Sequence, residues 1–383
     1  MINLFQPAVG DEELAAVEGV FRDNWLGHGP RTKAFEAAFA EHLGVAPDRV
    51  VFLASGTAGL FLIAESLGLA AGDEVVMPSM SFLAAANAVL AAGGRPVFCD
   101  VDPRTMNPGR EDVEAALTPR TRAVLLLHYG GQPGQVAEIA ALCRERGLTL
   151  IEDSACSIAS TAGGRAAGTF GDLAMWSLDA AKILTTGDGG LLYVRDAEQA
   201  ARLRRLAYHG LAQATGFGYA KVSHRWWELE VPEIGRRVIG NDLTAAIGAV
   251  QLRRLPEFMA RRREVVALYD RELADVPGLR LPPPLPEGHV SSHYFYWVQM
   301  DAAIRDGVAA DLLAAGVYTT FRYAPLHRVP TYGSDRVLPA TDRAAGETLC
   351  LPLHHGLTDD DVRTVAGRLR AALAERGRAA GAA

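Results

Sequence analysis

The segments IEDSACS (residues 151–157) and SLDAAKILTTGDGG (residues 177–190) carry the clearest structural signal in this chain of 383 residues. The first contains the end of a short apolar run that starts at Leu148, and the acidic residues Glu152 and Asp153 close this run. Such a pattern is typical of a strand buried in a parallel sheet. The second contains Lys182, 29 residues after Asp153, and closes on a glycine-rich turn. Together they predict strands of an α/β sheet with polar groups at their carboxyl ends, where ligands bind in such sheets.

Short apolar runs alternate with helix-like stretches on both sides of these segments. This spacing predicts βα units around a mostly parallel sheet of the seven-stranded type, with strands buried on both faces. The predicted strands are residues 50–54, 74–77, 95–99, 123–128, 148–152, 173–178 and 190–194. Amphipathic helices are expected at 11–24 and 31–43, ahead of the first strand.

The chain is too long for one hydrophobic core of ordinary size, so two domains are expected. We predict a large domain over residues 1–250 and a smaller C-terminal α+β domain over residues 251–383. A long helix at about 241–272 would connect them. The small domain is expected to contain a strand at 294–300 and helices at 304–315 and 359–376.

The composition is typical of a soluble globular enzyme, with 49% hydrophobic and 22% charged residues. The formal net charge is −7 and the basic residues are scattered, which argues against nucleic-acid binding. A secretory leader and a membrane-spanning run are not apparent, so a cytoplasmic protein without a membrane partner is expected. The four cysteines contain no CxxC pair, which indicates buried thiols and no metal site.

Lys182 and Asp153 form the strongest chemical pattern. A lysine amine in a desolvated site can form an imine and later move a proton, which is what a carbonyl cofactor requires. Asp153 would keep a pyridine nitrogen protonated and so keep the ring an electron sink. The alternative is that Asp153 caps a helix and Lys182 is solvated. We favour the chemical interpretation, because Lys182 lies beside an apolar strand and a glycine-rich turn.

Two further features suit a phosphorylated planar cofactor. The segment Ser55-Gly56-Thr57-Ala58 lies between a predicted strand and helix, so its amides and hydroxyls could cradle a phosphate. Many Ser/Thr–Gly turns cap helices without binding a ligand, which is the alternative. Phe82 could stack on a planar ring or pack in the core, and the residues alone do not separate these. For His128 a core position is favoured.

Ordered motifs extend through most of the chain. They are GPRTKAFE (29–36), SGTA (55–58), PSMSFLAAAN (78–87), PVFCDVD (96–102), HYGGQP (128–133), GTFGD (168–172), AAIGAVQL (245–252), PLH (325–327) and LPLH (351–354), in addition to the two segments quoted above. With these motifs the chain resembles the sugar aminotransferase family called DegT/DnrJ/EryC1/StrS, a branch of the fold-type I pyridoxal-phosphate enzymes. The resemblance covers nearly the whole sequence.

The resemblance implies roles for the matching residues. Gly56, Thr57, Ala58 and Ser177 would bind the phosphate of pyridoxal 5'-phosphate, Phe82 would stack on its ring, Asp153 would pair with its pyridine nitrogen and Lys182 would hold it as a Schiff base. Relatives that dehydrate sugars have histidine at the lysine position, so Lys182 favours amination. The resemblance also implies a homodimer with each active site shared across the interface.

Several positions depart from the family pattern. Cys156, included among the cofactor-binding candidates, replaces a common glutamine, and Asp179 replaces a common histidine. The segment Gly235-Arg-Arg-Val-Ile239 stands where the family has Gly-x-Asn-x-Arg. Because that asparagine reaches the phosphate of the neighbouring subunit in relatives, Arg237 is a candidate for the same contact, with a solvated turn as the alternative. These departures raise the question of a different ketone, and the aromatic stretch His224–Trp227 is a candidate lining for its pocket, with exposed or packed tryptophans as the alternative.

The expected activity is transfer of an amino group from glutamate or glutamine to a ketone, with pyridoxamine 5'-phosphate as the intermediate. The favoured ketone is a nucleotide-linked keto-sugar or a related keto intermediate of specialised or sugar biosynthesis. One alternative is another pyridoxal-phosphate reaction, such as elimination or decarboxylation. The other is a non-catalytic regulatory protein that binds the cofactor, although no DNA-binding segment is apparent.

Overall fold

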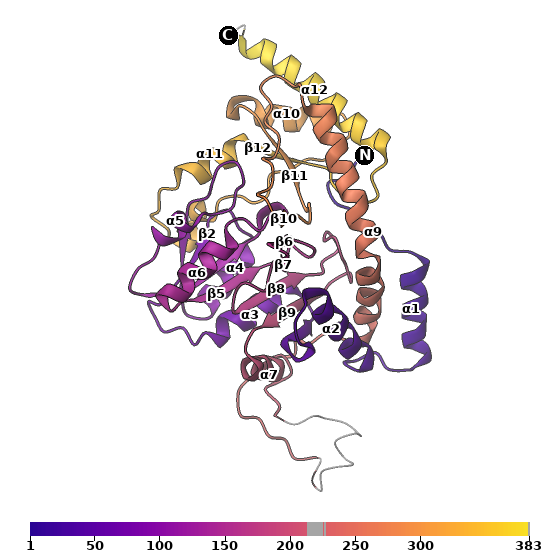
Figure 1. Cartoon of the computed structure of the whole chain (residues 1–383), viewed down its shortest axis with the longest axis vertical. Coiled ribbons are helices and arrows are strands. Elements are labelled where there is room, and N and C mark those ends of the chain that lie inside the picture. The colour runs from indigo at the N-terminus through magenta and orange to yellow at the C-terminus, as the bar shows by residue number, and fades with distance from the viewer. Residues whose placement is uncertain (213–224, 226, 382–383) are drawn as a thin grey trace.

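A seven-stranded sheet forms the centre of the computed structural model, which describes residues 1–212, 225 and 227–381 (Figure 1). Its strands are β1 (Val50–Leu53), β2 (Glu74–Pro78), β3 (Arg95–Cys99), β4 (Thr121–Leu127), β5 (Thr149–Asp153), β8 (Leu173–Ser177) and β9 (Gly190–Val194). They lie in the order β1-β9-β8-β5-β4-β2-β3. Strands β3, β2, β4, β5 and β8 are parallel, whereas β9 is antiparallel to both neighbours. The predicted mostly parallel α/β sheet is confirmed.

The strands form where the sequence has short runs of buried apolar residues. In β1 all four residues are buried, and alternate side chains enter different cores. Val50 and Phe52 belong to the core that also contains Trp176, whereas Val51 and Leu53 belong to the core beneath α3 and α4. A strand with both faces covered by other elements has no polar face, which explains the continuous apolar runs in the sequence.

Helices cover both faces of this sheet (Figure 1). They are α2 (Pro30–Leu43), α3 (Gly56–Ser66), α4 (Leu83–Ala91), α5 (Arg110–Glu114), α6 (Val136–Arg146) and α7 (Ala197–Leu206). The first helix, α1 (Asp11–Arg22), packs instead against the long helix α9 (Asp242–Leu273). Pro30 begins α2 at a position that needs no amide donor, and Gly44 ends it in the left-handed conformation. Asp242 caps α2 from a distant part of the chain, since its carboxylate accepts hydrogen bonds from the Thr32 amide at 2.8 Å and hydroxyl at 2.7 Å.

The helix α9 (Asp242–Leu273) carries the chain away from the large sheet (Figure 1). Its N-cap is Asn241, whose side chain accepts a hydrogen bond from Thr244 N at 3.0 Å. This is the long helix predicted at about 241–272. The predicted division between domains at residue 250 falls inside this continuous helix and stays a prediction.

A smaller α+β unit follows α9, with its own apolar core that includes Val265, Val298, Leu349 and Val365. It contains the antiparallel strands β11 (Tyr296–Gln299) and β12 (Thr348–Leu351). The helices of this unit are α10 (Ala302–Ala314), α11 (Pro339–Glu347) and α12 (Asp359–Gly381). Two 3-10 turns, at Leu326–Arg328 and Pro330–Tyr332, lie between α10 and α11. The strand predicted at 294–300 is shorter than expected, because Tyr294 and Phe295 precede β11.

A second small sheet was not predicted. It consists of β6 (Thr161–Ala162), β7 (Arg165–Ala166) and β10 (His289–Val290), in the order β10-β6-β7. Each strand has only two residues, so the sequence shows no alternation from which it could be recognised. Within the described residues, no helix is long and apolar enough to cross a membrane. Of the predicted aromatic lining His224–Trp227, His224 and Trp226 lie outside the described residues, as do Phe217 and Tyr219.

Candidate functional site

A cavity of about 350 Å³ lies at the carboxyl ends of the central strands. It brings together most of the residues singled out in the sequence, namely Gly56, Thr57, Phe82, Asp153, Ser177 and Lys182. These residues come from the ends of β5 and β8 and from the first turns of α3 and α4. The parallel βα arrangement places all these ends at one edge of the sheet, so residues far apart in sequence line one cavity.

The first turn of α3 presents backbone amides to the cavity. Ser55 is the N-cap, and its hydroxyl accepts the hydrogen bond of Ala58 N at 3.1 Å. The amides of Gly56 and Thr57 precede the first intrahelical hydrogen bond and point along the helix toward its N-terminus. Ser177 lies directly beside them, because a Cβ added to Gly56 would be 3.0 Å from the Ser177 Cβ. Such a group of amides and hydroxyls suits a phosphate.

Asp153 is a buried carboxylate at the end of β5. One of its oxygens accepts a hydrogen bond from Ala155 N at 3.1 Å. Burial raises the pKa of Asp153, although the Ala155 amide and the nearby Lys182 and His128 side chains oppose this rise. A buried carboxylate facing a cavity is costly unless a cation or a donor reaches it, and a protonated pyridine nitrogen is such a donor.

Lys182 lies in the turn region between β8 and β9, and its side chain enters the cavity. Its Nζ is 4.6 Å from the centroid of the Tyr294 ring. Burial acts to lower the pKa of Lys182, but Tyr294, Cys156 and the carboxylate of Asp153 outweigh burial and raise the pKa above its usual value. These neighbours therefore favour the protonated form of the Lys182 amine at the cavity wall.

Glu152, the neighbour of Asp153, has a structural role instead. It is buried, and its carboxylate accepts hydrogen bonds from Gly168 N at 2.6 Å and pairs with His128 Nε2 at 2.8 Å. His128 is itself 1% exposed. The core position expected for His128 fits these contacts, which hold the loop after β7 against the sheet.

Phe82 is the N-cap of α4, and its ring is 44% exposed. The ring centroid is 5.7 Å from that of Tyr323, at an angle of 58°. An apolar ring that stays this exposed next to Asp153 and Lys182 offers a flat face to the cavity. A planar ligand could stack on that face.

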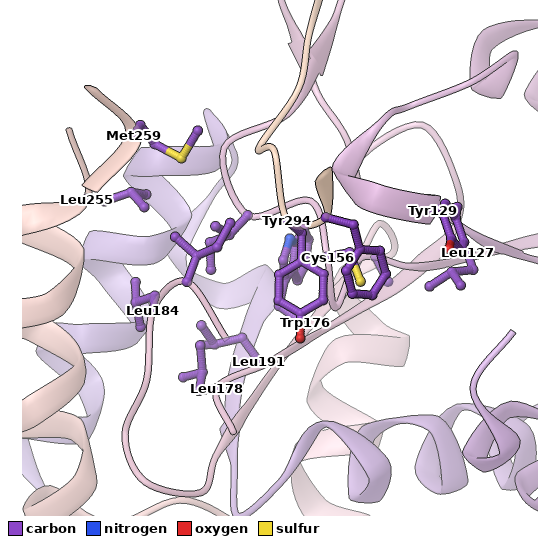
Figure 2. Packing of buried hydrophobic residues seen from close by; sticks show 14 of the residues in the cluster. Leu127, Tyr129, Cys156, Trp176, Leu178, Leu184, Leu191, Leu255, Met259 and Tyr294 are labelled. Atoms are coloured by element: carbon purple, nitrogen blue, oxygen red, sulfur yellow. The ribbon is translucent and has the colours of Figure 1, made fainter. Parts of the chain in front are cut away.

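Three predicted residues, Cys156, Arg237 and Ala58, do not line this cavity. Cys156 is buried beside it, with its Sγ 3.9 Å from the hydroxyl of Tyr323, and Figure 2 shows it in one apolar cluster with Tyr294 and Trp176. Arg237 is exposed, and its guanidinium lies 4.9 Å from the centroid of Tyr208. Ala58, deeper in α3, contributes only the amide that Ser55 occupies.

The sequence reasoning missed four residues of the cavity or its wall: Asp188, Tyr294, Arg322 and Tyr323. Asp188 belongs to the glycine-rich turn, and Tyr323 lies two residues before the motif Pro325-Leu-His. These positions were within reach of motif reasoning. Tyr294 and Arg322 had no such signal, because they arrive from the small unit through its packing against the sheet.

Among the residues that the structure describes, no group of three or more His, Cys, Asp or Glu side chains could hold a metal ion. The cavity combines a lysine, a buried carboxylate, helix N-terminal amides and an exposed aromatic face. This donor set suits a phosphorylated aromatic aldehyde with a basic ring nitrogen.

Comparison with known proteins agrees with this geometry. A family model described as the DegT/DnrJ/EryC1/StrS aminotransferase family matches residues 7–370. The chain is 62% identical over 373 residues to dTDP-4-dehydro-2,3,6-trideoxy-D-glucose 4-aminotransferase of Saccharopolyspora spinosa, covering 97% of each chain. The crystal structure of the aminotransferase TlmJ from Streptoalloteichus hindustanus is similar at a TM-score of 0.94 and 60% identity, covering 98% of this chain and 100% of TlmJ. A structure of DesI in the presence of its TDP-sugar product is similar at a TM-score of 0.86 and 32% identity, covering 100% of this chain and 94% of DesI.

Proposed function

Because this chain belongs to the DegT/DnrJ/EryC1/StrS aminotransferase family and is an aminotransferase, we propose that its cavity binds pyridoxal 5'-phosphate and aminates a nucleotide-linked 4-keto-sugar. Aminotransferases of this family depend on that cofactor. The observation that carries the proposal is the meeting of Lys182 and Asp153 in one cavity beside the N-terminus of α3.

The residues of the cavity fit the cofactor group by group. The amides of Gly56 and Thr57, with Ser177, would hold the phosphate, since the helix N-terminus favours an anion. The buried carboxylate of Asp153 would accept a hydrogen bond from the protonated pyridine nitrogen, which would offset the cost of burying its charge. Phe82 would cover one face of the ring.

When bound, the cofactor supplies an electron sink for the bonds at the reacting carbon. Lys182 would supply the acid–base group: its Nζ would take a proton from the α-carbon of the amino donor and pass it to the bound cofactor, and would move a proton in the opposite direction when the ketone is aminated. Asp153 stabilises the positive charge on the ring nitrogen throughout. The Tyr294 ring lies 4.6 Å from Nζ and limits the positions that the lysine amine can take during both proton transfers.

The acceptor is assigned from relatives. The Saccharopolyspora spinosa relative, identical at 62% of aligned positions, is named for a dTDP-linked 4-dehydro sugar, and the solved DesI structure contains a TDP-sugar product. The departures at Cys156 and Asp179 raised the question of another ketone. Cys156 is buried outside the cavity, whereas Asp179 lines it, so of these two departures only Asp179 can contact the acceptor there.

We further propose a homodimer whose subunits share each site, with Arg237 reaching the phosphate bound by the partner. Arg237 does not line the cavity of its own chain, and exposed apolar residues surround its segment. Leu229 is 69% exposed and Ile234 98%. Neighbouring apolar side chains left in solvent are typical of a surface that another protein covers.

The proposed chemistry is tested by absorbance of the protein loaded with pyridoxal 5'-phosphate. Glutamate or glutamine alone should convert the bound cofactor to its pyridoxamine form, and a dTDP-linked 4-keto-sugar should then convert it back. The Lys182→Ala variant should show neither change, whereas Lys33→Ala, at an exposed position, should behave as the wild type. Conversion by Lys182→Ala, or release of water or carbon dioxide without a ketone, would contradict the proposal.

The shared site is tested by mixing two inactive variants. Lys182→Ala chains and Arg237→Glu chains should each be inactive as homodimers. If each site uses both subunits, mixed dimers contain one intact site, so an equal mixture should regain about a quarter of the wild-type activity. A mixture that stays inactive, although differently tagged chains co-purify as mixed dimers, would show that Arg237 does not act in the site of the partner; an active Arg237→Glu homodimer would place Arg237 outside the site.

A further inference from the structure

Arg322 is a cation in the wall of the cavity without an anionic partner. It lines the same cavity as Asp153 and Lys182. Its guanidinium lies 4.9 Å from the centroid of the Phe5 ring, and its side chain has no hydrogen bond or ion pair within residues 1–212, 225 and 227–381. An arginine that faces a cavity with five free N–H donors can bind an oxyanion there through two parallel hydrogen bonds.

Nearby arginines differ from Arg322 in this respect. Arg328, six residues further on, pairs with Asp342 at 2.7 Å. Arg305 also lies over an aromatic ring, that of Phe321, but it donates a hydrogen bond to the carbonyl of Ala345 at 2.8 Å. Unlike these two arginines, Arg322 thus keeps its guanidinium donors available to a ligand in the cavity.

The backbone around Arg322 is fixed, so the guanidinium has a defined starting point. The Tyr129 hydroxyl donates a hydrogen bond to the Arg322 carbonyl. Thr320 pairs with Cys350 of β12, and Cys350 N donates to the Thr320 carbonyl at 2.7 Å. Tyr129 follows β4 of the large sheet, so contacts to both parts of the fold hold this segment. A side chain on a fixed backbone loses less freedom when it binds a ligand.

Arg322 is also set apart from the reacting amine. Phe5, on which it lies, stacks on Tyr294 with ring centroids 5.3 Å apart and planes at 11°. Tyr294 in turn contacts Lys182. The guanidinium and the Lys182 amine therefore contact different rings of one stacked pair.

We propose that Arg322 binds the oxyanion of a substrate, which is either a carboxylate of the amino donor or a phosphate of the nucleotide-linked acceptor. The inference rests on the proposed function, since it takes this cavity as the site of amino transfer. The cofactor phosphate is assigned to α3, so Arg322 remains for a second anion. A carboxylate and a phosphate both match the planar fork of a guanidinium.

The test is calorimetric titration of the enzyme loaded with pyridoxal 5'-phosphate, using two ligands that cannot react. Glutarate represents the donor carboxylates, and thymidine diphosphate represents the acceptor phosphates. Arg322→Gln should weaken the binding of one ligand on the order of tenfold or more, because a charge-assisted contact is lost. Arg322→Lys keeps the charge but not the fork and should recover only part of the affinity. Arg328→Gln is the matched control and should bind both ligands as the wild type does.

Each outcome has a defined meaning. Weaker binding of glutarate alone identifies the donor carboxylate, and weaker binding of thymidine diphosphate alone identifies the acceptor phosphate. Unchanged affinity for both ligands in folded Arg322→Gln would overturn the inference. Failure of the proposed function would appear separately, as loss of the cofactor absorbance change with glutamate in the wild-type enzyme.

Discussion

The ammonium of Lys182 lies 4.6 Å from the centroid of the Tyr294 ring, although the two residues belong to different parts of the chain. The Tyr294 ring is held by Phe5, stacked at 5.3 Å, and by Phe295 at 4.6 Å. Its hydroxyl is buried and has no hydrogen-bond partner within the described residues that meets normal geometry. An N-terminal residue and the small unit thus together set the surroundings of the lysine.

Replacing Tyr294 by Phe tests how this ring controls the lysine. Tyr294 is the strongest of the groups that raise the pKa of Lys182 against burial, so the Tyr294→Phe variant should have a lower lysine pKa. The neutral amine would then be available at lower pH, and uptake of pyridoxal 5'-phosphate should reach half its maximal rate at a lower pH than in the wild type. Stopped-flow absorbance across pH measures this, and an unchanged midpoint would contradict it.

The same position separates packing from chemistry. Tyr294→Phe keeps the stacking on Phe5, so its free energy of unfolding should stay within about 1 kcal/mol of the wild type. Tyr294→Ala leaves a cavity and should lower the free energy of unfolding by about 3 to 5 kcal/mol.

Asp153 should lower the stability of the cofactor-free protein while supporting its activity. Burial raises the pKa of Asp153, so the native state binds the proton more tightly than the unfolded state. The contribution of Asp153 to the free energy of unfolding therefore falls as pH rises through the window between the unfolded and the raised native pKa. At pH 7 the Asp153→Asn variant without cofactor should be more stable than the wild type.

Turnover provides the second half of this prediction. The Asp153→Asn variant should lose activity by about a hundredfold or more, because a neutral amide cannot balance the charge of the ring nitrogen. Denaturant unfolding of the cofactor-free proteins and steady-state rates of the loaded ones measure the two effects. A variant that is both less stable and fully active would refute this account of Asp153.

Gly56 is a position where any side chain should interfere. A Cβ there would lie 2.7 Å from Met175 Sδ and 3.0 Å from the Ser177 Cα. The Gly56→Ala variant should therefore shift α3 away from Ser177, at a cost of about 1 to 3 kcal/mol in stability, and bind the cofactor more weakly. Gly367→Ala in α12, where nothing lies within 4 Å, should instead stabilise by about 0.5 to 1 kcal/mol. Equal effects at both positions would exclude the steric explanation.

The four cysteines should be unreactive in the folded protein. All four are buried, and burial raises the pKa of Cys156 to about 11 and that of Cys143 to about 12. The thiolate that reacts is then scarce at pH 8. Titration with a chromogenic disulfide should detect no thiol in the native protein and all four after denaturation. One thiol that reacts rapidly in the native state would indicate an opening of the structure.

Lys182 and Asp153 could be predicted to lie at one edge of the sheet, because a lysine near a glycine-rich turn and an acidic strand end are local features of the sequence, and both residues line the cavity. Other motif residues prove to have structural roles. Glu36, at the end of GPRTKAFE, accepts a hydrogen bond from Phe52 N at 2.8 Å and pairs with Arg204 at 2.8 Å. Such a role needs the position of the partner, which the motif alone does not contain.

The amino-acid order alone predicted the α/β sheet, the long helix before the small unit and the placement of Lys182 and Asp153 at one edge of the sheet, because each depends on local spacing and on the common edge of parallel strands. Tertiary packing was needed to bring Tyr294 and Arg322 into the cavity wall and to leave Arg237 outside it. The physical reason is distance along the chain. Burial of many apolar side chains at once decides where the small unit and the N-terminal segment pack against the sheet. A short stretch of sequence does not contain this information.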